Sequence, residues 1–271
     1  MDGPELDAYL ARIGAARPAR AGAARPARAG AAALRELQLR HLRTVPFENL
    51  SIHLGERIVL EPGALRDKLV RRRRGGFCYE LNGAFSDLLS TLGFGVTLLA
   101  ARVFGDDGPG PPFDHLALRI DVGGSGPWLA DVGFGRHSYP LRLDTGADQA
   151  DPGGTFRIAE TADGDLDVIR DGQPQYRLEP RPRSLGDFEP TCWWQQTSPR
   201  SHFTRSLVCS LLTKRGRVTL SDRTLIRTTA EHRDERTLTG DAEVLDAYRT
   251  YFGIVLDHPP PWVAGDAAPQ R

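Results

Sequence analysis

The stretch RGGFCYELNGAF, residues 74–85, decides the fold around it. Two glycines, Gly75 and Gly76, permit a tight turn with unusual backbone angles directly before Cys78. After Cys78 the apolar residues recur at helical spacing, at Leu81, Phe85, Leu88, Leu89 and Leu92. Gly93 then marks the end of this helix. The pattern predicts a turn that places Cys78 at or near the N-terminus of a buried helix.

A helix N-terminus suits a reactive thiol. The unpaired amides and the positive end of the helix dipole favour a thiolate there, and such sites lower a cysteine pKa from about 8.5 to between roughly 3.5 and 7.5. A free cysteine is otherwise most often a small buried hydrophobic residue, and position alone does not exclude this alternative. Cys192 and Cys209 lack the glycine lead-in and a following helix. We expect Cys209 in the core and Cys192 packed beside Trp193 and Trp194.

A cysteine nucleophile usually works with a histidine, and the histidine with a third group that fixes its tautomer. Of the seven histidines, His115 opens a predicted strand on the face opposite Leu116 and Leu118, so it can face a cleft. Asp131 lies in WLADVGFG, residues 128–135, where strand residues would normally be apolar. This carboxylate needs a partner because an unpaired buried charge is costly. The partner can be His115 or, on this ground equally, an arginine.

Strand pairing decides whether His115 and Asp131 can meet. If GGSG at 123–126 alone forms the turn, His115 faces Phe134 and Asp131 points to the other face of the sheet. If the loop has an odd length, His115 faces Gly133, and Asp131 is its diagonal neighbour on the same face, about 7–8 Å away. A catalytic pairing therefore requires the odd register or a bulge.

The pattern along the whole chain indicates an α+β protein. Helical spacing dominates the first hundred residues, for example at Leu6, Leu10 and Ile13, where Gly14 can end the helix. A strand is expected over 95–104, followed by several further short strands, which suggests an antiparallel barrel or sandwich. The last segment mixes strands with a helix from Asp241. This order fits segregated domains better than a doubly wound sheet.

Composition excludes several classes of function. The 271 residues carry 35 basic and 35 acidic side chains, which argues against nucleic-acid binding. No apolar stretch is long enough to span a bilayer, and the N-terminus lacks a secretory apolar region, so we expect a cytoplasmic protein without membrane contact. Three cysteines argue against a disulfide framework, and without zinc-ligand spacing we expect no metal. The octapeptide GAARPARA, duplicated over 14–29, is interpreted as a surface loop.

Five motifs occur in the order typical of one enzyme family. They are VPFENL at 45–50, RGGFCYELN at 74–82, FDHLALRI at 113–120, DVGFG at 131–135 and TSPRSHF at 197–203. In these motifs the chain resembles the arylamine N-acetyltransferases. The resemblance implies a three-part cysteine-acyltransferase architecture: a helical bundle over 1–94, an antiparallel β-barrel over 95–200 and an α/β lid over 201–271.

The resemblance also implies the site. The family's catalytic cysteine, histidine and aspartate correspond to Cys78, His115 and Asp131. The residues that correspond to its apolar acceptor pocket are Phe47, Val103, Phe134 and Phe203, although ordinary core packing is the alternative for these four. The run Arg71 to Arg74 could attract CoA phosphates, but we favour a solvated helix C-terminus, where cations suit the dipole.

The implied function is transfer of an acetyl group from acetyl-CoA to an arylamine, arylhydrazine or N-hydroxyarylamine through an acetyl-cysteine, with ping-pong kinetics. Acetyl-CoA is then a cosubstrate, and no cofactor is bound permanently. Two enzymatic alternatives use the same triad: an amide synthase that releases a polyketide as a macrolactam, and a thiol hydrolase. A non-catalytic binding module is a further alternative. The sequence does not determine the oligomeric state.

Overall fold

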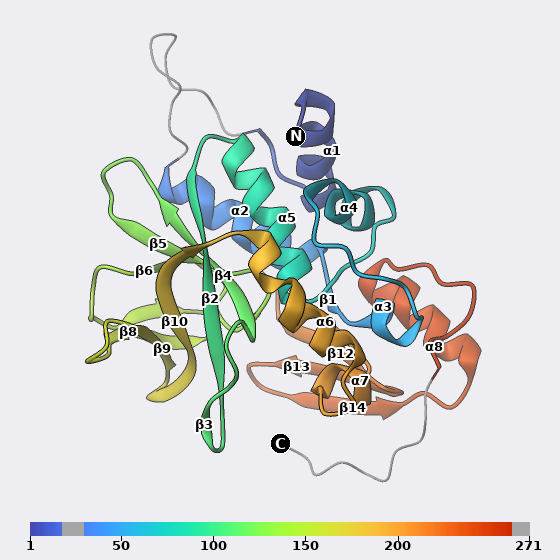
Figure 1. Cartoon of the computed structure of the whole chain (residues 1–271). Coiled ribbons are helices and arrows are strands. Elements are labelled where there is room, and N and C mark those ends of the chain that lie inside the picture. Colours follow the sequence, from blue (N-terminus) through green and yellow to red (C-terminus); the bar gives the residue numbers. More distant parts are fainter. Residues whose placement is uncertain (18–29, 262–271) are drawn as a thin grey trace.

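The computed structural model describes residues 1–17 and 30–261 and has three parts (Figure 1). Helices from the first third pack on one face of a large antiparallel sheet, and a smaller antiparallel sheet with a helix completes the chain. The predicted α+β architecture is confirmed. The duplicated octapeptide lies mostly outside the described residues. Among the described residues, no helix is long and apolar enough to cross a bilayer.

The helical part is built around the helix that begins at the cysteine. Its elements are α1 (Gly3–Ile13), α2 (Ala31–Thr44), α3 (Leu50–His53), α4 (Pro62–Arg66), a π-helical turn over Asp67–Arg71, and α5 (Cys78–Thr91). Helix α1 ends at Gly14, which adopts the left-handed conformation at φ 65°, as predicted. The apolar face of α5 is fully buried, and this central helix packs on the large sheet.

The large sheet has nine strands in the order β6-β5-β4-β2-β10-β9-β8-β7, with β3 paired to β2, and it curls into a nearly closed barrel. Its strands are β2 (Gly95–Gly105), β3 (Gly108–Pro109), β4 (His115–Asp121), β5 (Pro127–Ala130), β6 (Leu141–Arg142), β7 (Gln149–Asp151), β8 (Gly154–Glu160), β9 (Leu166–Arg170) and β10 (Gln173–Arg183). Leu116 and Leu118 join the core shared with the helices, whereas Ala117 joins a second core with Tyr176 and Leu178.

The loop between β4 and β5 has an odd number of residues. Leu118 pairs with Ala130 and Asp121 with Pro127, so the loop consists of the five residues 122–126. His115 and Asp131 are therefore on the same face of the sheet. Strand β5 ends at Ala130, so Asp131 follows the strand and does not lie within it, contrary to the assumption of the sequence analysis. The carboxylate of Asp131 accepts hydrogen bonds from the next amides, and this turn ends the strand.

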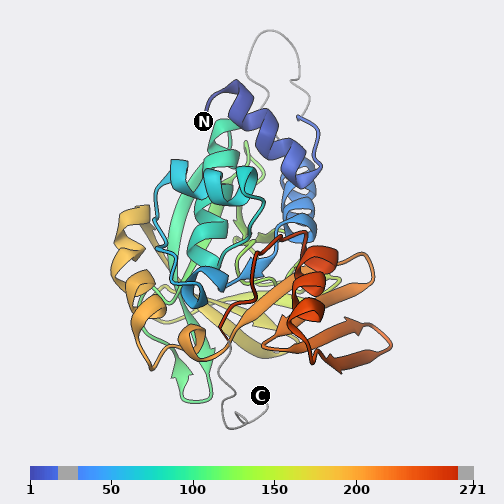
Figure 2. The same ribbon diagram turned by 90° about the vertical axis from the view of Figure 1, so that its right-hand side faces the viewer.

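The smaller sheet, called the lid sheet below, has the order β1-β11-β12-β13-β14. Its strands are β1 (Phe47–Glu48), β11 (Val208–Leu212), β12 (Gly216–Ser221), β13 (Thr224–Thr229) and β14 (Arg233–Thr237), and α8 (Asp241–Ala247) with a π-helical turn over Tyr248–Phe252 follows. In Figure 2 this orange-to-red part lies beneath the blue N-terminal helices. Because β1 comes from the helical part, the lid sheet is joined to it by strand pairing.

Helix α6 (Glu189–Thr197) and the short α7 (His202–Arg205) connect the two sheets. The expectation for Cys192 was wrong in two respects. Cys192 lies within α6, and its buried side chain is not packed beside exposed tryptophans: Trp193 is 62% exposed and Trp194 is 39% exposed. Successive residues of a helix point about 100° apart, so neighbours in sequence need not share an environment. Cys209 lies in the core, as predicted.

Candidate active site

Cys78 is the first residue of α5, and its side chain is buried. The residue before it, Phe77, is extended, with φ −96° and ψ −174°. The preceding glycines are needed for space, not for unusual backbone angles as the sequence suggested. A Cβ on Gly75 would lie 2.0 Å from the carbonyl oxygen of Pro46, and one on Gly76 would lie 2.7 Å from Glu80 Oε2. The tight approach of these chain segments fixes the position of the sulfur.

Glu80 stabilises the turn at which Cys78 begins helix α5. Its Oε2 accepts a hydrogen bond from the Phe77 amide at 3.2 Å, and its Oε1 pairs with Lys68 Nζ at 2.6 Å. Both side chains are buried. Burial raises the pKa of Glu80 above its usual range, although the charge of Lys68 acts in the opposite direction. A carboxylate three residues after the N-cap that accepts the N-cap amide is half of a capping box.

His115 and Asp131 form a buried pair. His115 Nε2 lies 2.7 Å from Asp131 Oδ2, and neither side chain is more than 2% exposed. Burial by itself would lower the pKa of His115, but the charge of Asp131 and the hydrogen bond to it raise this pKa to about 10. Burial would likewise raise the pKa of Asp131, but the charge of His115 and the donors around it hold that pKa well below its usual range. The arrangement favours an imidazolium beside a carboxylate.

Asp131 accepts four further hydrogen bonds. Asn82 Nδ2 and the amides of Gly133 and Phe134 donate to Oδ1 at 2.8, 2.8 and 3.0 Å, and the hydroxyl of Tyr176 donates to Oδ2 at 3.1 Å. The sequence analysis found neither Asn82 nor Tyr176. Asn82 had a detectable signal, because it lies four residues after Cys78 and therefore on the same face of α5. Tyr176 comes from β10, and nothing in its local sequence indicates the contact.

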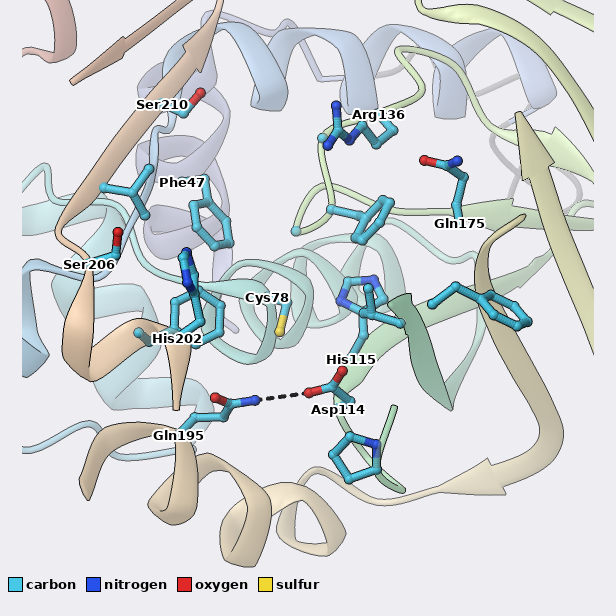
Figure 3. Close-up of a pocket in the computed structure, with 18 of the residues that line it drawn as sticks. Phe47, Cys78, Asp114, His115, Arg136, Gln175, Gln195, His202, Ser206 and Ser210 are labelled. Atoms are coloured by element: carbon cyan, nitrogen blue, oxygen red, sulfur yellow. Dashed lines mark hydrogen bonds between the residues drawn. The ribbon is translucent and has the colours of Figure 1, made fainter. Parts of the chain in front are cut away.

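The second nitrogen of His115 is available to Cys78. Because Asp131 binds Nε2, the imidazole presents Nδ1 to its other neighbour. The neighbouring sulfur of Cys78 adds to the rise in the pKa of His115. Figure 3 shows both side chains in the centre of one cavity. The structure thus brings the three sequence-predicted residues together in the order sulfur, imidazole and carboxylate.

The cavity has a volume of about 790 Å³ and lies between the large sheet and the lid sheet. All four residues assigned to an acceptor pocket line it: Phe47 from β1, Val103 from β2, Phe134 after β5, and Phe203 from α7. The ring centroids of Phe47 and Phe203 are 6.1 Å apart, and Phe134 lies 5.4 Å from the ring of His115. These aromatic side chains on the cavity wall can accommodate a planar ring.

Polar residues that the sequence analysis did not single out also line the cavity. Asp114, beside His115, accepts a hydrogen bond from Gln195 Nε2 at 2.9 Å, and Gln195 Oε1 in turn accepts one from Ser201 at 2.6 Å (Figure 3). Burial raises the pKa of Asp114. Arg136 and Arg217 lie on the same cavity wall as Gly135. Because these residues come from distant segments, only the folded chain reveals them as neighbours.

Comparison with known proteins identifies the family. Residues 31–260 match the sequence model of an N-acetyltransferase family. The chain is 37% identical over 263 residues to the arylamine N-acetyltransferase of Mycobacterium tuberculosis, which covers 92% of this chain and 89% of that protein. The chain belongs to the arylamine N-acetyltransferase family. The predicted resemblance is confirmed, and the chain is an acetyltransferase by family.

Solved arylamine N-acetyltransferases have the same fold. The structure of the Mycobacterium smegmatis protein superimposes with a TM-score of 0.83 at 36% identity, covering 94% of this chain and 92% of that one. The Mycobacterium marinum protein in complex with CoA superimposes with a TM-score of 0.80 at 34% identity, covering 92% of both chains. Because the coverage is nearly complete in both directions, the helical part, the barrel-like sheet and the lid sheet all belong to the family's fold.

Proposed function

We propose that this chain transfers an acetyl group from acetyl-CoA to an arylamine, arylhydrazine or N-hydroxyarylamine through an acetyl-Cys78 intermediate. The observation that carries the proposal is the buried His115–Asp131 pair, which faces the sulfur at the N-terminus of α5. The CoA complex of the Mycobacterium marinum relative supports CoA thioesters as donors. The acceptor would lie between the rings of Phe47, Phe134 and Phe203, with Val103 completing the pocket.

In the first half-reaction, Cys78 reacts as a thiolate, because its proton is already held on Nδ1 of His115, which is an imidazolium. The thiolate attacks the thioester carbonyl carbon, so a C–S bond forms and the carbonyl electrons move to oxygen. The first amides of α5 have no intrahelical acceptor and can stabilise this oxyanion. The tetrahedral species collapses, the bond to the CoA sulfur breaks, and His115 returns the proton to the departing thiolate.

In the second half-reaction, the acceptor nitrogen attacks the acetyl carbon on Cys78. His115 takes a proton from this nitrogen, and the bond to the Cys78 sulfur breaks to release the amide and the thiolate. Asp131 keeps the imidazole oriented and stabilises its positive charge in both halves. Free CoA leaves before the amine reacts, which predicts ping-pong kinetics.

CoA release tests the proposal directly. Without an amine, the native protein should release one equivalent of CoA per chain and gain one acetyl group on Cys78, measured by thiol titration and mass spectrometry. With an aromatic amine or hydrazide, release should become continuous. Cys78→Ala should do neither, because it has no nucleophile.

Cys192→Ala is the matched control, since Cys192 is a second buried cysteine that does not line the cavity. It should keep turnover within a few-fold of the native protein. Acetyl transfer by Cys78→Ala would refute the proposal. Continuous CoA release without an amine would instead identify a hydrolase, with water as the acceptor.

A further inference from the structure

Helix α2 carries a glutamine on its buried face. Gln38 is fully buried and lies one helical turn from Leu34 on one side and from Leu42 on the other. A leucine at this position would continue the apolar stripe of the helix, whereas a buried carboxamide is costly unless its donor and acceptor atoms are bound. The partners of Gln38 therefore show what the polar side chain contributes.

Those partners are the two ends of one loop, residues 131–137. The oxygen Oε1 of Gln38 accepts a hydrogen bond from the amide of Asp131 at 3.2 Å. Its nitrogen Nε2 lies 3.3 Å from Nδ1 of His137 and 3.5 Å from the carbonyl oxygen of the same residue. Because Nδ1 donates its proton to the carbonyl of Tyr139 at 2.7 Å, it has no lone pair left for Gln38. The carboxamide therefore binds the main chain at both loop ends, by a long bond at the second.

The bond to Gln38 completes the hydrogen bonding of the amides over 131–134. These amides lie outside the paired strand, because β5 ends at Ala130. Gln38 accepts the first of them, Asn82 of α5 accepts the second at 2.9 Å, and the carboxylate of Asp131 accepts the other two. Buried amides of this kind need such partners. Two helices thus hold the consecutive residues at which the chain leaves the sheet.

The loop over 131–137 carries parts of the site that must not shift. Its first residue supplies the carboxylate that lies 2.7 Å from Nε2 of His115. Gly133 packs against the nucleophile, since a Cβ there would lie 2.7 Å from the Cα of Cys78. The ring of Phe134 lies 5.4 Å from that of His115. A displacement of the loop ends would change the distance between carboxylate and imidazole, on which the protonated state of the imidazole depends.

We propose that Gln38 is a positioning residue, which holds both ends of the loop over 131–137 and thereby fixes the Asp131 carboxylate against His115. Gln38 is not among the described residues that line the cavity, so it acts through Asp131 and not on a substrate. The inference rests on the proposed function, because it concerns the imidazole that this function uses.

The pH dependence of Cys78 alkylation tests the proposal. Iodoacetamide reacts with the thiolate, so the rate, followed by mass spectrometry of the Cys78 peptide, rises with pH as the thiol ionises. The midpoint is low while a well-placed imidazolium faces the sulfur. Gln38→Met keeps the length of the side chain but neither hydrogen bond. It should move the midpoint to higher pH by about one unit, which means about tenfold less thiolate on the acid side.

Gln196→Met is the matched control. Gln196 also joins two backbone groups through one carboxamide, since its Oε1 accepts the Ile58 amide at 3.3 Å and its Nε2 donates to the Cys192 carbonyl at 3.0 Å. It is likewise not among the described residues that line the cavity. Its loss should leave the midpoint at the native value. A merely structural role for Gln38 would give faster alkylation at every pH with the native midpoint, and this result would overturn the proposal.

Acetylation of Cys78 by acetyl-CoA gives a second measurement. At a pH below the native midpoint, Gln38→Met should lower the acetylation rate about tenfold and leave the KM for acetyl-CoA within about twofold, because Gln38 does not contact the cavity. Gln38→Asn is polar but one carbon too short to reach both partners, so it should shift the midpoint in the same direction. It takes the place of Gln38→Met if that variant does not fold. An equal shift in Gln196→Met would overturn the proposal.

The alkylation profile needs no acyl donor, so it separates this inference from the proposed function. If Gln38→Met raises a low native midpoint but native Cys78 is not acetylated by acetyl-CoA, the proposed function fails and the positioning role stands. If native Cys78 is acetylated and Gln38→Met keeps the native midpoint and acetylation rate, the positioning role alone fails.

Discussion

The negative charge of the buried Asp131 side chain is stabilised by several individual neighbours. A carboxylate that is fully buried would normally take up a proton or lose its place in the core. Here the imidazole, a carboxamide, a phenol and two amides all donate to it. The carboxylate in turn keeps His115 protonated. The site thus stores an imidazolium–carboxylate pair whose charges depend on each other.

This pair predicts that stability declines at high pH. The pKa of His115 is about 10 in the folded protein, above the usual 6.5. A raised pKa contributes stability that is complete below the unfolded value and lost as the pH rises through the folded value. The free energy of unfolding, measured with urea, should therefore fall between pH 7 and pH 10 by about 3–4 kcal/mol from this group.

His115→Gln provides the comparison, because it removes the titrating group and keeps a donor for Asp131. Its free energy of unfolding should decline less over the same interval. Parallel pH profiles for the two proteins would show that the imidazole is not held protonated by the fold.

The sequence predicted the three residues that meet in the cavity but only part of what surrounds them. The motifs identified Cys78, His115 and Asp131, and counting residues showed that only an odd loop allows the last two to meet. The structure has that loop over 122–126. Tyr176 could not be found, because its contact depends on which strand lies beside β2 in the sheet, and strand order is set by long-range packing.

Helix α5 positions Cys78, the proposed nucleophile, and its first turn depends on a buried ion pair. Lys68 comes from the π-helical turn over Asp67–Arg71, and Glu80 comes from α5. The pair therefore connects two elements, and its Glu80 member also accepts a hydrogen bond from the Phe77 amide. Removing one member of such a pair leaves the other charged and buried without compensation.

Lys68→Met should destabilise the protein by about 3–5 kcal/mol, because Glu80 would be left unpaired. The double variant Lys68→Met with Glu80→Gln should recover a large part of this loss, since the glutamine is neutral and can still accept the Phe77 amide. Urea unfolding of the two single variants, the double variant and the native protein completes the cycle. Equal losses in the lysine variant and the double variant would mean that the charge on Glu80 is not the cause.

Helices with strong apolar periodicity could be predicted from the sequence, and two elements without it could not. Helix α6 places both of its tryptophans at least partly in solvent, so its apolar residues do not follow a helical face. Strand β14 reads RDERT and is exposed throughout, because it is the edge of the lid sheet. An edge strand is ordered by its neighbour and carries charges that prevent further pairing, so its own composition resembles a loop.

At the scale of the molecule, the cavity exists because the lid sheet is held against the helical part. The side chain of Asn49 contributes to this connection through hydrogen bonds. Its Nδ2 donates to the carbonyls of Phe203 at 2.9 Å and Ser206 at 2.7 Å, and its Oδ1 accepts the Val208 amide at 2.8 Å. The side chain is 1% exposed, so water does not replace these bonds if they are lost.

Asn49→Ala should therefore loosen the lid. The Ser206 carbonyl and the Val208 amide, both partly buried, would lose their side-chain partner. The Phe203 carbonyl would keep His53 Nε2 at 3.0 Å, so the free energy of unfolding should fall by about 1–3 kcal/mol. Because residues of β11 and β12 form one wall of the cavity around Cys78, local opening should also speed alkylation of that sulfur by iodoacetamide at neutral pH. Gln173→Ala, which removes an exposed carboxamide, should change neither quantity. Lower stability with an unchanged alkylation rate would show that access to Cys78 is controlled by another part of the fold.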